Sequence, residues 1–133
     1  MTREALKGEF IPDGWREVVN PLESSFGREA IRIVAGPVGP GGGSHRYVAT
    51  RDDGSILLEV SFQKGHRNEV GVNGVLADTI LAIVLDHLKG FQSGEFSSRE
   101  NALVITKLEE AMLWIKAREL DRDYRGVLGS YSR

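Results

Sequence analysis

The chain contains the uninterrupted stretch RENALVITKLEEAMLWIKARELDR at residues 99–122. It holds no Gly or Pro, and its apolar residues recur at helical spacing, which predicts one long amphipathic helix. Arg118 and Arg122 are four residues apart and therefore share a face near the end of this helix. Paired guanidinium groups favour phosphate or pyrophosphate oxygens, because each group offers several donors in a fixed plane. The predicted apolar face comprises Val104, Leu108, Ala111, Met112 and Ile115.

Local signals predict the ends of this helix and a second helix before it. Ser97-Ser-Arg-Glu100 matches the capping box, with Ser97 as N-cap and Glu100 bonding back to it. Gly126 is the expected C-terminal stop. A second helix is predicted from Leu76 to Gly90, where glycine is expected to end it. Its apolar residues lie on more than one face, so a second subunit can cover the face that this chain leaves exposed. They are Leu76, Ile80, Leu81, Ile83, Val84, Leu85 and Leu88.

The N-terminal half has the composition of an antiparallel sheet. Strands are predicted at 30–35, 45–50 and 56–62, and the Asp53-Gly54 pair predicts a tight turn between the last two. A flexible loop is expected at 36–44, a turn at Asn73-Gly74, and an extended arm or a strand with loops in the first thirty residues. The predicted class is α+β. A single domain over 1–133 comprises a β-rich part, 1–75, and a helical hairpin, 76–133.

Composition restricts the classes of function. The chain has 133 residues and a formal net charge of -2, which argues against duplex DNA or RNA as the main partner. It has no cysteine, so neither a disulfide framework nor thiolate chemistry is expected. The longest apolar run, Ile80 to Leu85, is too short for a bilayer, and the first residues lack a signal-peptide core. We therefore expect a soluble intracellular protein with no membrane partner.

Several spaced motifs carry a resemblance to a known family. They include Phe91-Gln-x-Gly-x-Phe96, Arg99-Glu-Asn-Ala102, Thr106-Lys-Leu-Glu-Glu-Ala111 with Trp114, Asp121-Arg122 and Arg125-Gly-Val-x-Gly129, preceded by Val60-Ser-Phe-Gln-x-Gly65 and Glu69-Val-Gly-Val-Asn-Gly-Val75. From about His45 to its C-terminus the chain resembles the helical hairpin domain shared by the phage anti-defence proteins Tad1 (Thoeris anti-defence 1) and Acb2. Acb2 proteins are essentially helical, so the Tad1 family, which has a β-region, is the more similar of the two.

The resemblance implies a sponge rather than an enzyme. Tad1 proteins bind the cyclic ADP-ribose isomers made by TIR-domain enzymes of Thoeris immunity, and some also sequester the cyclic oligonucleotides of CBASS immunity at a separate site. They form homo-oligomers, as dimers or as hexamers built from three dimers, with ligand pockets between subunits. Accordingly, we expect neither a cofactor nor a metal site, and action in the cytoplasm of the infected bacterium.

The family's ligand-binding positions correspond here to Phe91, Asn101, Arg118 and Arg122. An aromatic ring can stack on adenine, an amide can read a base edge or ribose hydroxyl, and the arginines can neutralise a pyrophosphate. Of the nearby acids, Glu119, Asp121 and Asp123, some are expected to hold the arginines in place. Arg125 and Ser130 are candidates for the second nucleotide site, although the family usually has Thr at the latter position.

Other interpretations stay open for the same residues. The arginines can favour the helix dipole and pair with local acids, Phe91 can be a core residue, and Asn101 can be an ordinary first-turn residue. Core or interface packing is expected for Trp114. As alternative functions, the chain can sequester cyclic di- or trinucleotides at the same or a second site, or be a purely structural phage oligomer. The histidines, His45, His66 and His87, are too scattered to predict a metal site.

Overall fold

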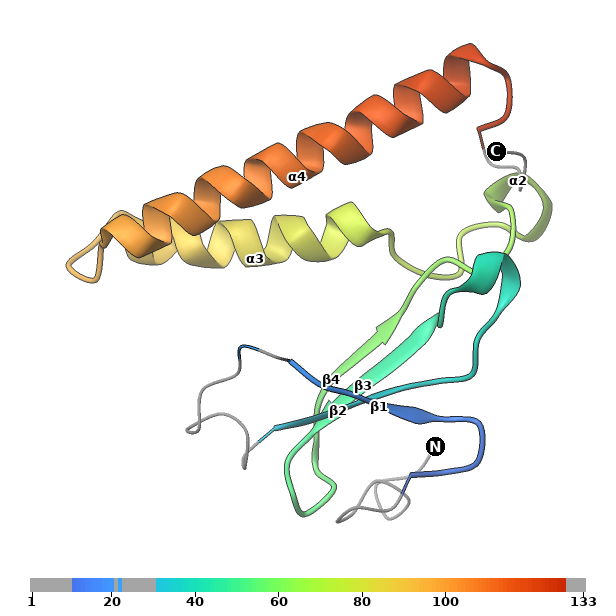
Figure 1. Ribbon diagram of the computed structural model, residues 1–133, viewed down its shortest axis with the longest axis horizontal. Coiled ribbons are helices and arrows are strands. Elements are labelled where there is room, and N and C mark those ends of the chain that lie inside the picture. The colour runs from blue at the N-terminus through green and yellow to red at the C-terminus, as the bar shows by residue number, and fades with distance from the viewer. Residues whose placement is uncertain (1–10, 21, 23–30, 129–133) are drawn as a thin grey trace. The chain divides into compact units, whose positions relative to one another are not determined.

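The computed structural model describes residues 11–20, 22 and 31–128, and the chain divides into two compact units, Met1–Gly74 and Val75–Arg133. The strands belong to the first unit and the long helices to the second (Figure 1). The predicted α+β class, an antiparallel sheet followed by a helical hairpin, is therefore confirmed. A single domain over 1–133 stays a prediction.

Four strands form one antiparallel sheet, in which strands that are consecutive in the sequence are neighbours. Three of them begin and end within about two residues of the predicted strands, and the fourth falls in the predicted N-terminal arm. Residues 1–10, 21 and 23–30 of that arm lie outside the described residues. The strands are β1 (Arg16–Val18), β2 (Arg32–Ala35), β3 (Arg46–Thr50) and β4 (Ile56–Ser61).

The turn between β3 and β4 has the predicted chemistry. Gly54 adopts a φ of 86°, a conformation that glycine tolerates without steric cost. The Asp53 carboxylate accepts a hydrogen bond from the Ser55 N–H at 2.8 Å, and the Arg51 N–H donates to the Ser55 carbonyl oxygen at 2.9 Å. The hairpin that Asp53-Gly54 predicts is confirmed.

The sheet has a small core around two valines on neighbouring strands. Val34 of β2 pairs with Val48 of β3, each side chain is 1% exposed, and Trp15 packs against them. Thr50 at the end of β3 is equally buried. Few apolar side chains are buried among the described residues of this unit. The hydrogen bonds of its loops therefore contribute much of its stability.

The glycine-rich segment 36–44 is not the irregular loop that its composition predicts. It contains a 3₁₀ turn at Pro40–Gly42, and the Gly39 N–H donates to the Gly43 carbonyl oxygen at 2.9 Å. The buried Ser44 hydroxyl donates to the Gly36 carbonyl oxygen at 2.8 Å. The prediction is wrong because glycines permit this tight path and a buried hydroxyl then closes it.

Two side-chain amides close the loop between Gln63 and Asn73. The Asn73 amide bonds both backbone groups of Lys64, accepting from its N–H at 2.8 Å and donating to its carbonyl oxygen at 2.7 Å. The Gln63 amide accepts from the Asn73 N–H at 3.0 Å and donates to the Gly71 carbonyl oxygen at 2.8 Å. The loop contains a short helix that was not predicted, α2 (Arg67–Val70). Asn73 thus fastens a whole loop.

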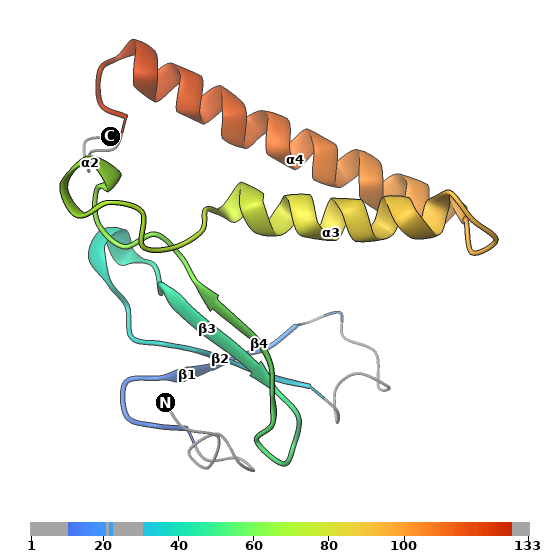
Figure 2. The same cartoon turned by 180° about the vertical axis from the view of Figure 1, so that it is seen from behind.

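The second unit is an antiparallel pair of helices, α3 (Ala77–Gln92) and α4 (Arg99–Tyr124), which lie side by side in both Figure 1 and Figure 2. The predicted stop at Gly90 is wrong, because α3 continues through Gln92. Ser93 ends the helix instead: its N–H donates to the Lys89 carbonyl oxygen at 3.1 Å and its hydroxyl to that of Gly90 at 2.8 Å. Glycine weakens a helix but does not by itself end one.

The N-cap of α4 is Ser98 rather than the predicted Ser97. The Ser98 hydroxyl oxygen accepts a hydrogen bond from the Asn101 N–H at 3.0 Å. The Gln92 amide fixes this position, because it accepts from the Ser98 N–H at 3.0 Å and donates to the Ser98 carbonyl oxygen at 2.9 Å. A contact from the preceding helix therefore selects between two adjacent serines with similar capping ability.

The other end of α4 closes as predicted. Gly126 adopts a φ of 73°, its N–H donates to the Asp123 carbonyl oxygen, and the Val127 N–H donates to the Arg122 carbonyl oxygen at 2.9 Å. This is the Schellman arrangement, which satisfies carbonyl groups that the helix leaves without a partner. It also turns the chain back beside the last turn of α4.

Part of the apolar surface of the hairpin stays exposed in the single chain. Among its described residues only Arg122 is buried. Leu113 and Trp114 are each 70% exposed, so the core interpretation of Trp114 is wrong for the single chain, and its place at an interface stays a prediction. No helix among the described residues is long and apolar enough to cross a membrane.

We expect Gly74→Ala to destabilise the first unit by about 1–3 kcal/mol, a typical effect of overpacking. An added Cβ would lie 2.4 Å from the Phe62 carbonyl carbon, and backbone cannot yield as a flexible side chain does. Urea unfolding followed by the amide NMR signals of β3 and β4 measures the effect. Gly43→Ala is the matched control, because Gly43 has a φ of -98° and an added Cβ meets nothing within 4 Å. Equal unfolding midpoints would contradict the close packing.

Candidate functional site

The predicted ligand residues lie at opposite ends of the hairpin. Phe91 is near the end of α3 and Asn101 is in the first turns of α4, beside the connecting loop, whereas Arg118 and Arg122 are in the last turns of α4. Arg118 follows Asn101 by 17 residues, which is about 25 Å along a helix axis. One chain therefore does not bring all of these side chains to one site.

The first cluster is aromatic. Phe91 is 45% exposed, and the His87 ring meets it edge-on, with ring centroids 5.0 Å apart and planes at 86°. Phe96 of the connecting loop also packs edge-on, at 6.4 Å. Edge-to-face contacts fix the orientation of an aromatic ring, and the exposed part of Phe91 stays accessible to a ligand. The sequence analysis missed His87 as part of this cluster, although its place one turn before Phe91 on the same helix indicates contact.

Asn101 lies next to this aromatic cluster. Its backbone N–H is used by the Ser98 cap, and its side-chain nitrogen makes only a long contact of 3.4 Å to the Phe96 carbonyl oxygen. No hydrogen bond to its side-chain oxygen occurs among the residues that the structure describes. The amide can therefore still accept a hydrogen bond from a ligand. Asn101 is both a first-turn residue and a candidate contact.

The second cluster presents one free arginine and one fixed arginine. Arg118 is exposed and forms no ion pair or hydrogen bond through its side chain within residues 31–128. Arg122 is only 7% exposed, and its Nη2 donates to the Val127 carbonyl oxygen at 3.1 Å. The Schellman turn therefore orients Arg122, whereas Arg118 can move to meet an anion.

The acids near these arginines pair with other cations. Glu119 bonds Lys116 at 3.2 Å, and Asp121 bonds Arg125 at 3.1 Å. The expectation that local acids hold the predicted arginine pair is therefore wrong for these two acids. They form ion pairs instead with Lys116 and Arg125, which lie three and four residues away on the helix. This pairing leaves the guanidinium of Arg118 available.

Of the two candidates for the second nucleotide site, the structure describes one. Arg125 is engaged by Asp121, and Ser130 lies outside the described residues. No group of three or more His, Asp or Glu side chains within the described part of the chain is arranged to hold a metal ion. The hairpin thus offers an aromatic and amide cluster at one end and a cationic cluster at the other.

Comparison with known proteins gives two matches to this architecture. Residues 55–118 match the family model described as Acb2/Tad1, hairpin domain, which begins just before β4 and includes Phe91, Asn101 and Arg118. A protein named Thoeris anti-defense 1, from Bacillus phage SBSphiJ7, is 42% identical over 92 residues. That alignment covers 69% of this chain and spans 65% of the length of the relative.

We expect Gln92→Ala to destabilise the hairpin by about 1–3 kcal/mol, since it removes two hydrogen bonds of ordinary strength. Hydrogen exchange at the Ser98 amide, whose N–H donates to Gln92, should become faster in proportion. Glu95→Ala changes an exposed residue of the same loop and is the control. If both variants exchange at the rate of the unmodified chain, Gln92 does not hold the turn.

Proposed function

We propose, because the chain belongs to the Acb2/Tad1 hairpin family, that it is a phage anti-defence protein that captures cyclic ADP-ribose signals of Thoeris immunity inside the infected bacterium. The carrying observation is the division of the ligand-binding chemistry between the two ends of one hairpin. The name of the relative refers to action against the same defence system. Sequestration of the signal follows from binding alone and needs no bond to break.

The division of the site favours a pocket shared by two chains. The clusters are separated by about 25 Å along α4, farther than one cyclic ADP-ribose molecule can reach. If two hairpins lie antiparallel about a two-fold axis, the aromatic end of each meets the arginine end of the other. This arrangement creates two identical pockets, each with Phe91 and Asn101 from one chain and Arg118 and Arg122 from its partner.

The uncovered apolar surface supports such an assembly. Leu113 and Trp114 on α4, together with Ile83 on α3, are more than 60% exposed in the single chain. Exposed large side chains of this kind mark protein interfaces, and aromatic residues are enriched there. The proposed protein is therefore a homo-oligomer, either a dimer or a hexamer of three dimers.

Three of the four proposed contacts, those of Phe91, Asn101 and Arg118, use groups that the described part of the single chain leaves available. The Phe91 face can stack on adenine, the Asn101 amide can accept from the base or ribose, and Arg118 can reach the pyrophosphate. Arg122 is already oriented by its bond to the Val127 carbonyl oxygen. Because the ligand is a ring and several contacts are fixed in advance, little conformational freedom is lost on binding.

Cyclic di- or trinucleotides of CBASS immunity are the alternative ligands, at the same pocket or at a second site. The second site has less support from the described residues, because Asp121 engages the guanidinium of Arg125. A purely structural oligomer is a further alternative, in which Arg118 serves subunit contact. The first experiment below separates the structural alternative from signal capture.

The shared pocket predicts complementation between two inactive variants. Phe91→Ala and Arg118→Ala should each weaken capture of cyclic ADP-ribose by about 10- to 100-fold, the loss expected for a stacking or charge-assisted contact. When the two variants are unfolded together and refolded as a mixture, some oligomers gain one pocket with both side chains intact. Calorimetry should then show tight binding at a reduced stoichiometry.

Arg51→Ala, at the exposed turn between β3 and β4, is the control for loss of an arginine. If the mixture binds no better than either variant, Phe91 and Arg118 of two chains do not form one shared pocket. If Arg118→Ala dissociates the oligomer, the arginine serves assembly, and the structural alternative is favoured.

Non-catalytic capture predicts that the ligand is released unchanged. None of the four proposed contact residues is a nucleophile, and none is a base at neutral pH, because arginine stays protonated and an amide does not accept protons. After long incubation and heat denaturation, chromatography and mass spectrometry should recover the cyclic molecule intact and in the amount bound. Recovery of linear ADP-ribose, absent from a heated ligand-only sample, would show an enzyme.

A further inference from the structure

A groove of about 440 Å³ lies in the first unit. Its wall has an apolar part, Pro37, Val38 and Phe62, and a cationic part, Arg46 and Lys64, and it also includes the ring of His45. No carboxylate is among the residues that line it. The volume is in the range of pockets that hold small molecules, which are typically about 300–1,000 Å³.

His45 is held between two backbone acceptors. Its Nδ1 lies 3.0 Å from the Gln63 carbonyl oxygen, and its Nε2 lies 3.1 Å from the Pro40 carbonyl oxygen. Gly39 permits this position, because a Cβ there would lie 2.4 Å from the ring. The two carbonyl groups therefore hold the ring in the groove wall.

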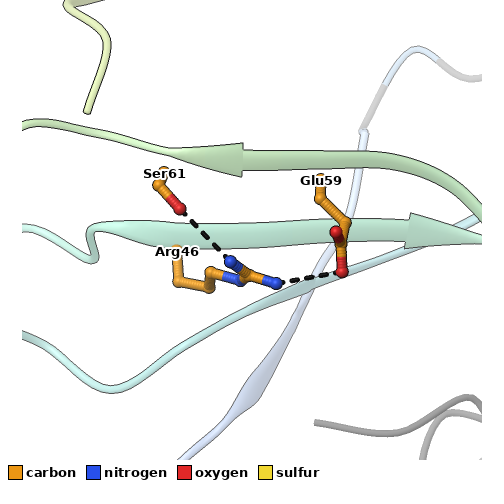
Figure 3. Close-up of polar contacts among 3 residues, drawn as sticks. All are labelled: Arg46, Glu59 and Ser61. Atoms are coloured by element: carbon orange, nitrogen blue, oxygen red, sulfur yellow. Dashed lines mark hydrogen bonds and ion pairs between the residues drawn. The ribbon is translucent and has the colours of Figure 1, made fainter. Parts of the chain in front are cut away.

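Arg46 is one of the two cations of the wall, and it is partly neutralised. Figure 3 shows its guanidinium between two side chains of the adjacent strand β4: it donates to the Ser61 hydroxyl oxygen at 3.2 Å and pairs with the Glu59 carboxylate at 2.9 Å. Glu59 is not among the residues that line the groove. Its single negative charge offsets the charge of Arg46.

Lys64 is the second cation, and its ammonium has no partner among the residues that the structure describes. Its backbone, however, is fixed on both sides by the amide of Asn73. The backbone of the lysine is therefore anchored beside the groove, and its ammonium forms no ion pair with the described residues. A compact ammonium of this kind is a common ligand for phosphate.

We propose that this groove binds a small organic phosphate of about the size of a nucleoside monophosphate. The phosphate lies against Lys64, in the positive field to which Arg46 contributes, and the flat organic part lies against Phe62, Pro37 and Val38. Both parts are needed: the cationic part attracts the anion, and the apolar part adds contacts that inorganic phosphate cannot make. This site is separate from the proposed capture of immune signals at the hairpin.

The test is an NMR titration of the full chain with AMP, inorganic phosphate and adenosine, reading the amides of Gly39, Ser61 and Lys64. We expect saturable shifts at these amides, with AMP binding more tightly than either part alone. Lys64→Met should weaken AMP binding at these amides about tenfold, the effect of one charge-assisted contact. Arg51→Met removes the same charge from the far turn of the β3–β4 hairpin and should leave the affinity unchanged.

Three results would overturn the proposal. Equal weakening by Lys64→Met and Arg51→Met would show attraction by net charge alone. Inorganic phosphate binding as tightly as AMP would exclude a role for the apolar wall. Shifts confined to amides of α3 and α4 would place AMP at the hairpin. Each result leaves signal capture at the hairpin intact, because that proposal depends on Phe91, Asn101 and Arg118.

Discussion

The reciprocal hydrogen bonds between the Gln92 side chain and the Ser98 backbone are the contact on which the arrangement of the hairpin depends. They bring the end of α3 to the N-cap of α4 and so decide which serine begins the second helix. Once that register is set, Phe91 and Asn101 lie beside the connecting loop. The 26 residues of α4 then carry the arginines to the opposite end. The division of the candidate site is thus a consequence of one turn and one helix length.

The same device recurs in the first unit, where the amides of Gln63 and Asn73 close a loop through backbone groups. A carboxamide has both a donor and an acceptor, so it can replace a missing strand in satisfying the backbone. In such a small sheet, whose core centres on Val34 and Val48, these bonds offset the scarcity of apolar burial. Several motif residues that carry the family resemblance therefore contribute hydrogen bonds that maintain the fold.

Charge is distributed differently in the two units. On α4 the acids pair with Lys116 and Arg125, which leaves Arg118 unpaired among the described residues. In the sheet, Glu59 pairs with Arg46 and leaves Lys64 beside the groove. A chain with a formal net charge of -2 can therefore present local positive sites. Net charge excludes a broad interface with nucleic acid more readily than it excludes a pocket for a single phosphate.

The sequence by itself determined the class of the fold, three of the four strands, the turn at Gly54 and the stop at Gly126. These features depend on periodicity and turn chemistry within a few residues. It also indicated Phe91, Asn101 and Arg118 as candidate contacts, through residue chemistry and resemblance. Only the tertiary structure decided that Ser98 caps α4, that α3 passes Gly90, that Arg122 is buried and that the candidate site is divided. Each of these outcomes depends on contacts between residues of different elements or on the path of the backbone. The spacing of residue types alone does not predict such contacts or that path.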